Sequence, residues 1–322
     1  ALGYDAATEG YTGPNWSINV AKRALNIGLD DDLVSDFNGV KAVNREEACL
    51  YAFNTLKATM VEYENNNSVT VNGITFTNKS TAKDMANTGK TDGNIKDDGL
   101  MQFAEKYFTK LSKKGTSDDF KRPATEWMLK AKSIGTYADA ADLSYTATVE
   151  IGTIYSDLGL SKGIDDSKVT YYEDGRNLSS SWTQDIVKGS KVEKGGNGTL
   201  LEVYYNDDAE SLTVIAINTY VGKITASYKA STTKDAYVTF TAKTGAGSSY
   251  ETDDSYSKDD IVLYTYSSKA GDAGVKSMAL AEKVTGKMNG FTAAKNVTVD
   301  GTTYKKSANG TPITPGMNTS VG

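Results

Sequence analysis

The feature of this 322-residue sequence that most restricts its fold is a change of pattern near residue 64. Before it, apolar residues recur every three or four positions, which is the period of an amphipathic helix. After it, and almost without interruption from residue 120, β-branched and aromatic residues alternate with polar ones, which is the period of half-buried strands. The pattern predicts an α+β multidomain chain, with a helical N-terminal part followed by mainly antiparallel β domains in the form of a small barrel or sandwich.

Length and pattern together predict three domains. A helical region covers residues 1–65, a β-rich domain with one helix covers 66–222, and a small antiparallel β domain covers 223–322. "ENNN" at 64–67 reads as the linker after the helical region. The helix of the second domain is expected near 98–114, where apolar residues share a face and Gly115 follows as a stop signal.

Several hairpins are predicted from local signals alone. "VTVNGITF" at 69–76 and "VTVDGTTY" at 297–304 each place an Asn-Gly or Asp-Gly pair between alternating segments, which is a strong two-residue turn signal. A third hairpin joins 200–206 to 211–217 through "DDAE". "YVTFTA" and "IVLYTYS" read as further strands. Whether the two Gly turns mark a repeated unit is left open.

Two helices are expected in the N-terminal region. The first runs through "WSINVAKRALNI", where Trp16 lies on one face with further apolar residues, and it ends at Gly28. Trp16 is expected in the core, with stacking on a sugar ring as the alternative. The second begins in "VNREEACLYAFNTL" at 43–56 and reaches about Met60. Its expected buried face comprises Ala48, Cys49, Ala52, Phe53, Leu56 and Met60.

The start of the second helix has a specific local chemistry. Asn44 is a good N-cap, and Glu47 stands three residues later, as a capping box requires. Glu46 suits the positive end of the helix dipole, whereas Arg45 does not. Arg45 is therefore expected to have a partner of its own, and the three aspartates at 30–32 are one candidate.

Composition excludes several classes of function. There is no histidine, which removes Ser-His-Asp and Cys-His catalysis and histidine-ligated zinc. The single cysteine, Cys49, is expected to be buried as a small hydrophobe. A net charge of −6 with scattered Lys and Arg argues against nucleic acid as a partner.

No apolar run is long enough to span a membrane, so membrane insertion is not expected. The chain starts without methionine inside what looks like a motif, and we expect an upstream part to have been removed or to lie outside this sequence.

Carboxylates give weaker signals. A carbohydrate hydrolase would need two of them, and Glu126 beside Trp127 and Glu202 in a strand are the candidates, but nothing in the sequence brings them together. "DGNIKDDG" at 92–99 fails as an EF-hand, because Lys96 stands where an oxygen ligand is required. No cofactor is predicted. Calcium bridging the acidic pairs in turns is the alternative.

Residues 11–56 resemble a surface-layer homology (SLH) motif. "YTGPNWSINVAKRALNIGLDDDL" matches the family's early Trp helix, and "VNREEA" at 43–48 matches its Thr-Arg-Ala-Glu segment. Asn44 stands at the family's threonine and Arg45 at its arginine, while Glu47 matches the glutamate. Glu46 replaces the alanine and adds negative charge, and only one complete motif is present.

The resemblance implies a function. In the family, three such motifs pack together and bind pyruvylated secondary cell-wall polysaccharide, with the motif arginine at the acidic sugar. It implies Arg45, Asn44, Glu47 and Trp16 as polysaccharide-binding residues here. The expected protein is a secreted, extracellular structural component of the cell wall or surface layer of a Gram-positive anaerobe. It would associate with its own copies and would not be an enzyme. The alternative is the anchor or accessory region of a surface carbohydrate-active enzyme.

Overall fold

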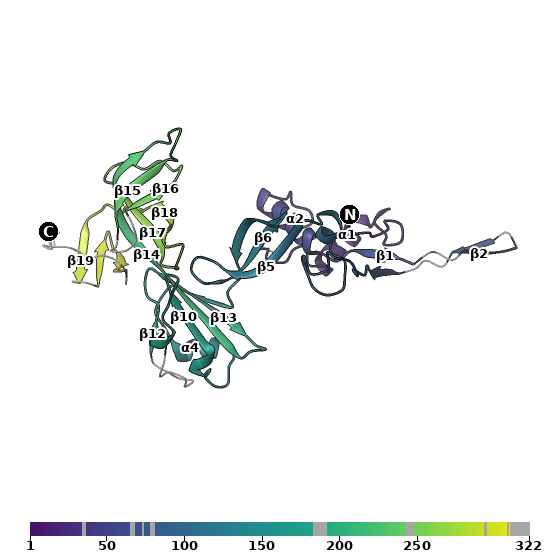
Figure 1. Cartoon of the computed structure of the whole chain (residues 1–322), viewed down its shortest axis with the longest axis horizontal. Helices are drawn as coiled ribbons and strands as arrows, with labels where there is room; N and C mark the ends of the chain where they lie inside the picture. The colour runs from purple at the N-terminus through teal and green to yellow at the C-terminus, as the bar shows by residue number, and fades with distance from the viewer. Residues whose placement is uncertain are drawn as a thin grey trace. The chain divides into compact units, whose positions relative to one another are not determined.

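The computed structural model describes residues 1–33, 37–64, 68–72, 74–77, 81–182, 192–242, 248–292, 295–307 and 309. The chain forms two compact units (Figure 1). The first comprises Ala1–Gly115 and Thr125–Thr136, and the second comprises Thr116–Ala124 and Tyr137–Gly322. Most strand pairs are antiparallel and the described helices are few, so the predicted β-rich α+β class is confirmed. The domain boundaries after residues 65 and 222, the SLH identity and the barrel or sandwich form stay predictions.

The first unit combines short helices with small sheets. Its helices are α1 (Trp16–Asn26), α2 (Arg45–Lys57) and α3 (Phe103–Tyr107). Its two-stranded sheets pair β1 (Val61–Tyr63) with β4 (Ala82–Asp84) and β2 (Ser68–Val71) with β3 (Ile74–Thr77). A three-stranded sheet consists of β5 (Leu111–Ser117), β6 (Pro123–Leu129) and β7 (Lys132–Ala138).

Both predicted N-terminal helices form, but their buried faces were predicted wrongly. α1 ends at Gly28 as expected, with φ of +69° and the Leu29 N–H donating to the Ala24 carbonyl. It nevertheless buries no residue, and Trp16 is 55% exposed, so its placement in the core is wrong. The core near these helices consists of Leu2, Ala58 and Met60, which lie outside both helices. Met60 is buried as predicted, although α2 ends at Lys57 and does not reach it.

α2 turns a polar side inward, and this explains why its predicted apolar face is not the buried one. Its buried residues are Glu47 and Asn54. The side-chain NH2 group of Asn54 donates to the backbone carbonyls of Leu29 and Asp31 at 3.1 and 2.9 Å. Cys49 is exposed, contrary to the prediction, as are Ala48, Ala52 and Phe53. Leu56 is half-buried against a core of Ile95, Ala104, Leu111 and Trp127.

The helix predicted over 98–114 is wrong in extent. Only α3 forms there, and at Leu111 the chain enters β5. The reason is tertiary: as a strand residue Leu111 packs with Ile95, Ala104 and Trp127. Glu105 adds a second constraint, because its fully buried carboxylate accepts hydrogen bonds from the Ile95 and Lys96 amides and so ties the loop before α3 to the helix.

The second unit is organised around β14 (Ser211–Tyr228). The N-terminal half of β14 pairs with β13 (Thr199–Asn206) on one side and, in parallel, with β10 (Val169–Glu173) on the other. Its C-terminal half pairs with β15 (Tyr237–Thr241) and β17 (Ile261–Ser267). The predicted 200–206 and 211–217 hairpin is confirmed by this register, as are the two later strands.

Shorter strands complete the second unit. These are β8 (Leu143–Tyr145), β9 (Val149–Glu150), β11 (Arg176–Asn177), β12 (Glu193–Lys194), β16 (Ser249–Glu251), β18 (Gly274–Leu280), β19 (Met288–Thr292), β20 (Asn296–Val299) and β21 (Thr302–Lys305). The β20–β21 turn has φ of +48° at Asp300 and +83° at Gly301, which confirms the predicted hairpin. The equivalent β2–β3 pairing also forms, although Gly73 of its turn and residues 65–67 of the predicted linker lie outside the described residues.

The second unit also contains helices that the strand-like pattern did not predict. They are α4 (Ile151–Asp157) and the 3-10 turns η1 (Asp166–Lys168) and η2 (Ser179–Ser181). α4 forms because Ile151, Ile154 and Tyr155 follow helical spacing, and all three are fully buried in a core shared with β13 and β14. The alternating pattern favoured strands throughout 143–156. Strands do form there as β8 and β9, but the prediction is wrong from Ile151 onward, where the chain forms α4.

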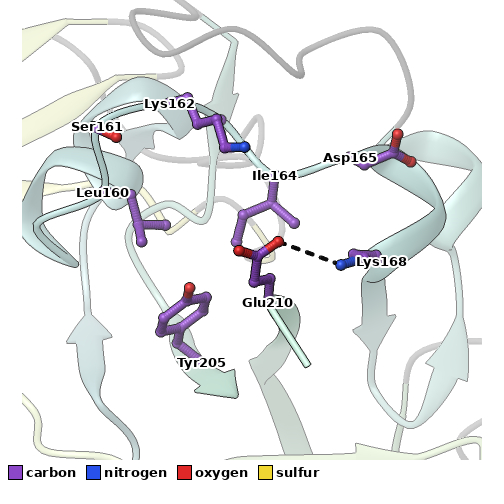
Figure 2. Close-up of a pocket in the computed structure, with 9 residues that line it drawn as sticks. Leu160, Ser161, Lys162, Ile164, Asp165, Lys168, Tyr205 and Glu210 are labelled. Carbon is purple, nitrogen blue, oxygen red and sulfur yellow. Dashed lines mark ion pairs between the residues drawn. The ribbon is translucent and has the colours of Figure 1, made fainter. Parts of the chain in front are cut away.

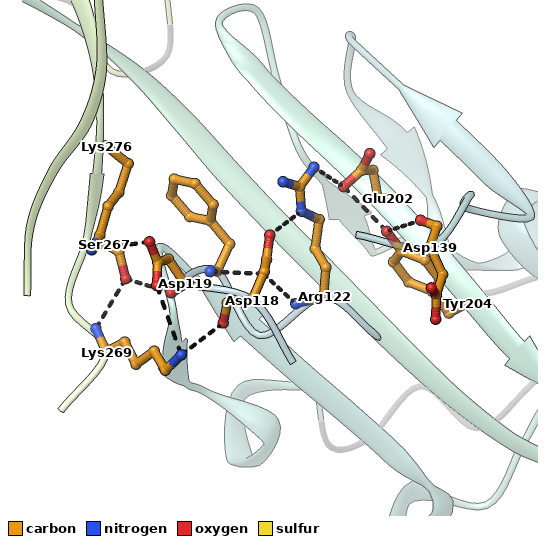
Figure 3. A network of polar contacts seen from close by, with 10 residues as sticks. Asp118, Asp119, Arg122, Asp139, Glu202, Tyr204, Ser267, Lys269 and Lys276 are labelled. Atoms are coloured by element: carbon orange, nitrogen blue, oxygen red, sulfur yellow. Dashed lines mark hydrogen bonds and ion pairs between the residues drawn. The ribbon is translucent and has the colours of Figure 1, made fainter. Parts of the chain in front are cut away.

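A polar network holds residues 118–122 against strands of the second unit (Figure 3). The Asp118 carboxylate accepts from the Phe120 and Arg122 amides at 2.9 Å and pairs with the Arg122 guanidinium at 2.7 Å. Arg122 also pairs with Glu202 on β13 at 3.4 Å. Lys276 on β18 pairs with Asp119 at 3.0 Å. The segment is thus tied to several strands by side-chain contacts.

Candidate functional site

The N-terminus of α2 has the predicted capping geometry. The Glu47 amide donates to the Asn44 side chain, and the Asn44 amide donates to the Glu47 carboxylate, both at 2.8 Å. Lys41 forms an ion pair with the other Glu47 oxygen at 3.1 Å. The hydrogen bond from the Asn44 backbone, followed by the contact with Lys41, lowers the pKa of Glu47 below its ordinary value. Asn44 and Glu47 therefore form a rigid, pre-organised helix end.

Arg45 projects from this helix end into solvent. Its side chain is exposed, and no ion pair or hydrogen bond joins it to another residue that the structure describes. The aspartates at 30–32, which the sequence offered as partners, form no ion pair with it. A guanidinium beside the free amides of a helix N-terminus can bind an anion through two parallel hydrogen bonds.

Arg23, in the same unit, differs from Arg45 because its guanidinium contacts other side chains. It pairs with Glu9 at 2.6 Å, donates to the Tyr11 hydroxyl at 3.3 Å, and lies 4.7 Å from the centre of the Tyr4 ring. These hydrogen bonds raise the pKa of Arg23 above its ordinary value. Arg23 is a structural residue that the sequence did not single out, and its contacts contrast with those of Arg45.

Of the predicted binding residues, the structure brings three together. Asn44, Arg45 and Glu47 share the first turn of α2, whereas Trp16 begins α1. No hydrogen bond or ring contact joins Trp16 to those three in the described part of the chain. The indole is exposed, so it is available for contact with a ligand or another helix.

The opposite end of α2 borders a polar cavity of about 520 Å³. Its lining includes Lys57, Lys96 and Lys113, which form no ion pair with another described residue. The wall is fixed by Asn54, whose amide bridges two backbone carbonyls. Sequence reasoning missed this site, because its residues come from α2, the loop before α3 and β5.

A second cavity lies in the second unit and is about 360 Å³ in volume (Figure 2). It is formed by the segment from the end of α4 to η1, the end of β13 and the β13–β14 turn. We call it the η1 pocket, and it is lined by Leu160, Ser161, Lys162, Gly163, Ile164, Asp165, Lys168, Tyr205 and Glu210. Its floor is apolar and its rim is charged. None of these residues was singled out in the sequence.

The candidate hydrolytic carboxylates have different surroundings. Glu202 is held by Arg122 at 3.4 Å and accepts a long hydrogen bond from Tyr204 at 3.5 Å. Glu126 belongs to the first unit and Glu202 to the second. Among the described residues, no group of three or more Asp, Glu, Cys or His side chains is arranged to hold a metal ion. No helix in the described ranges is both long and apolar enough to cross a membrane.

Comparison with known proteins gives no relative. No family model matches the chain, and no curated protein or solved structure does either. Function therefore has to be inferred from the geometry of the sites described above.

Proposed function

We propose that this chain is a structural component of a bacterial cell envelope. In this proposal it attaches to an acidic wall polysaccharide through the N-terminus of α2 and associates with its own copies through the β-rich second unit. It acts outside the cell, in the wall or surface layer, and has no catalytic role.

The observation that carries the proposal is the state of Arg45. It occupies a helix position where a cation is locally unfavourable, and it makes no compensating contact with any described residue. An acidic sugar would supply that contact and would also accept from the free amides of the first turn. The capping box holds this end of the helix in place, so little ordering would be required on binding.

The exposed apolar residues of α1 support an assembly of similar helices. Trp16 is 55% exposed, Val20 lies four residues later on the same side and is 39% exposed, and no α1 residue is buried. An amphipathic helix with an uncovered apolar side is typical of a surface that packs against another protein segment. In the proposal, this side of α1 packs against helices of the same type, as the SLH resemblance implies.

The second unit offers a surface for self-association. Val221, Leu263 and Ala279 are direct cross-strand neighbours on β14, β17 and β18, and all three are exposed. β18 pairs only with β17 among the described strands, so its other edge has no partner there. An apolar row beside an open edge is suited to strand or face contacts between copies.

The attachment is tested by co-sedimentation of the full chain with purified bacterial cell walls. Arg45→Ala is expected to lose most of the wall-bound fraction, while circular dichroism stays unchanged. Lys22→Ala is the matched control, because Lys22 is an exposed cation on α1 and its loss removes the same charge. Arg45→Lys keeps the charge but not the paired geometry, and intermediate binding is expected. Equal binding by Arg45→Ala and Lys22→Ala would contradict the proposal.

A further inference from the structure

The η1 pocket carries two opposite charges that do not meet. Lys162 has no ion pair or hydrogen bond with another described residue, although it lines the cavity. Glu210 pairs through Oε2 with Lys168 at 3.5 Å, and its Oε1 has no partner in the described chain. Figure 2 shows both side chains beside Ile164, and they form no ion pair with each other.

The floor between these charges is apolar. Ile164 is 7% exposed, and Leu160 and the Tyr205 ring are half-buried against the same core. Leu160 is positioned by the end of α4, where Gly159 has φ of +70° and the Leu160 amide donates to the Tyr155 carbonyl at 3.0 Å. Small-molecule sites combine such an apolar lining with a few convergent polar groups, in cavities of about 300–1,000 Å³.

Glu210 is held in place at a conformational cost. Its φ of +47° lies in the left-handed region, which costs an ordinary side chain more than Gly or Asn. Lys168 fastens the same turn by donating to the Ala209 carbonyl at 3.1 Å while pairing with Glu210. An acid in a position that favours Gly or Asn is consistent with a role for its carboxylate.

We propose that the η1 pocket binds a small zwitterion with an apolar side chain, of the chemical class of a free α-amino acid. The ligand carboxylate pairs with the Lys162 ammonium, and the ligand ammonium pairs with Oε1 of Glu210. The side chain lies on Ile164, Leu160 and the Tyr205 ring. One ligand thereby pairs with the Lys162 ammonium and with the remaining oxygen of Glu210, and it covers the apolar floor. The site is independent of Arg45 and of wall attachment.

The test uses four probes that remove one feature at a time. L-Leucine carries both charges and an apolar side chain, N-acetyl-L-leucine lacks the ammonium, L-leucinamide lacks the carboxylate, and glycine lacks the side chain. Each is titrated into the full ¹⁵N-labelled chain, and amide shifts are followed by TROSY NMR. Leucine is expected to give saturable shifts confined to residues 160–168 and 205–210. Each of the other three should bind about tenfold more weakly or not at all.

Two variants assign the charges. Lys162→Ala should lower the affinity for leucine about tenfold and abolish the discrimination between leucine and leucinamide. Glu210→Gln should abolish the discrimination between leucine and N-acetylleucine. Lys229→Ala and Glu251→Gln remove exposed charges elsewhere in the second unit and should leave binding unchanged.

Three results would overturn the proposal. Leucine shifts that rise linearly to its solubility limit would show that there is no site. Equal affinity for leucine, leucinamide and N-acetylleucine would show that the pocket does not recognise the carboxylate and ammonium of the ligand. Unaltered leucine binding in both Lys162→Ala and Glu210→Gln would move any site away from the η1 pocket.

Discussion

Glu105 should be the most sensitive polar residue of the first unit. Its carboxylate is 0% exposed and accepts four hydrogen bonds. Oε1 accepts from the Ile95 and Lys96 amides at 2.9 and 3.2 Å, and Oε2 accepts from the Gln102 amide and the Asn87 side chain at 3.3 and 2.8 Å. All four groups are donors, so the site requires an acceptor at both oxygen positions.

Glu105→Gln keeps the shape of the side chain and replaces one oxygen by an NH2 group. Either orientation of the amide turns that NH2 toward two donors, and two hydrogen bonds to a charged group are lost. Such bonds contribute ~1.5–3 kcal/mol each. A buried neutral amide costs less to desolvate than a carboxylate, which offsets part of the loss. We expect the first unit to lose ~2–4 kcal/mol of its free energy of unfolding.

The assay is urea unfolding of 5-fluorotryptophan-labelled protein followed by ¹⁹F NMR. The chain has three Trp, of which Trp127 lies in a core of the first unit and Trp182 in a core of the second. Glu105→Gln should lower the midpoint of the Trp127 transition and leave that of Trp182 unchanged. Glu126→Gln is the matched control, since Glu126 is only half-buried on β6 of the same unit. A Trp127 midpoint equal to that of this control would refute the reasoning.

Three further predictions follow from the described contacts. Phe53→Ala should lower the free energy of unfolding of the first unit by only ~1–2 kcal/mol, which is less than the loss of a core phenylalanine. The reason is that Phe53 is 39% exposed and packs edge-on against Trp127, with the ring centroids 5.3 Å apart. A loss above ~3 kcal/mol in the Trp127 transition would contradict this prediction. Burial raises the pKa of Asp174 above its ordinary value of 3.8, so the carboxyl stabilises the fold most below pH 3.8 and this contribution is lost as pH rises through the folded-state pKa. The free energy of unfolding of the parent relative to Asp174→Asn, measured by the Trp182 transition, should therefore increase as pH falls from about 7 toward 4. A flat or opposite trend would exclude a raised pKa for Asp174. Leu263→Lys should reduce self-association in sedimentation velocity, since it charges the exposed row on β17, and undiminished association would remove that row as a contact.

Local chemistry accounts for the parts of the fold that the sequence predicted well. Asn44 and Glu47 form a capping box because both partners stand within one turn. The Asp300-Gly301 turn likewise forms from two adjacent residues that tolerate positive φ. These signals require no knowledge of the rest of the chain.

The parts that were predicted wrongly depend on distant residues. The polar side of α2 faces inward because Asn54 reaches the carbonyls of Leu29 and Asp31, which lie in the preceding loop. Leu111 becomes a strand residue through packing against Ile95 and Trp127. For α2, apolar periodicity predicted the helix but not which of its sides is buried. The buried side is set by the carbonyls of the preceding loop, which accept hydrogen bonds from Asn54.

The candidate sites divide in the same way. The predicted site at Arg45 lies within one helical turn, so its residues are neighbours in the sequence. The η1 pocket joins residues 160–168 to Tyr205 and Glu210, which come together only through the β13–β14 hairpin. No spacing rule connects these positions, so the pocket could be recognised only in the folded chain.

The central claim is that Arg45 binds an acidic group of a wall polysaccharide. The most direct measurement is isothermal titration of the full chain with purified, solubilised wall polysaccharide, before and after conversion of its carboxylates to amides. We expect saturable binding to the native polymer that weakens as salt rises, loss of binding to the amidated polymer, and the same loss in Arg45→Ala. Equal affinity for the native and amidated polymers, or undiminished binding by Arg45→Ala, would contradict the account.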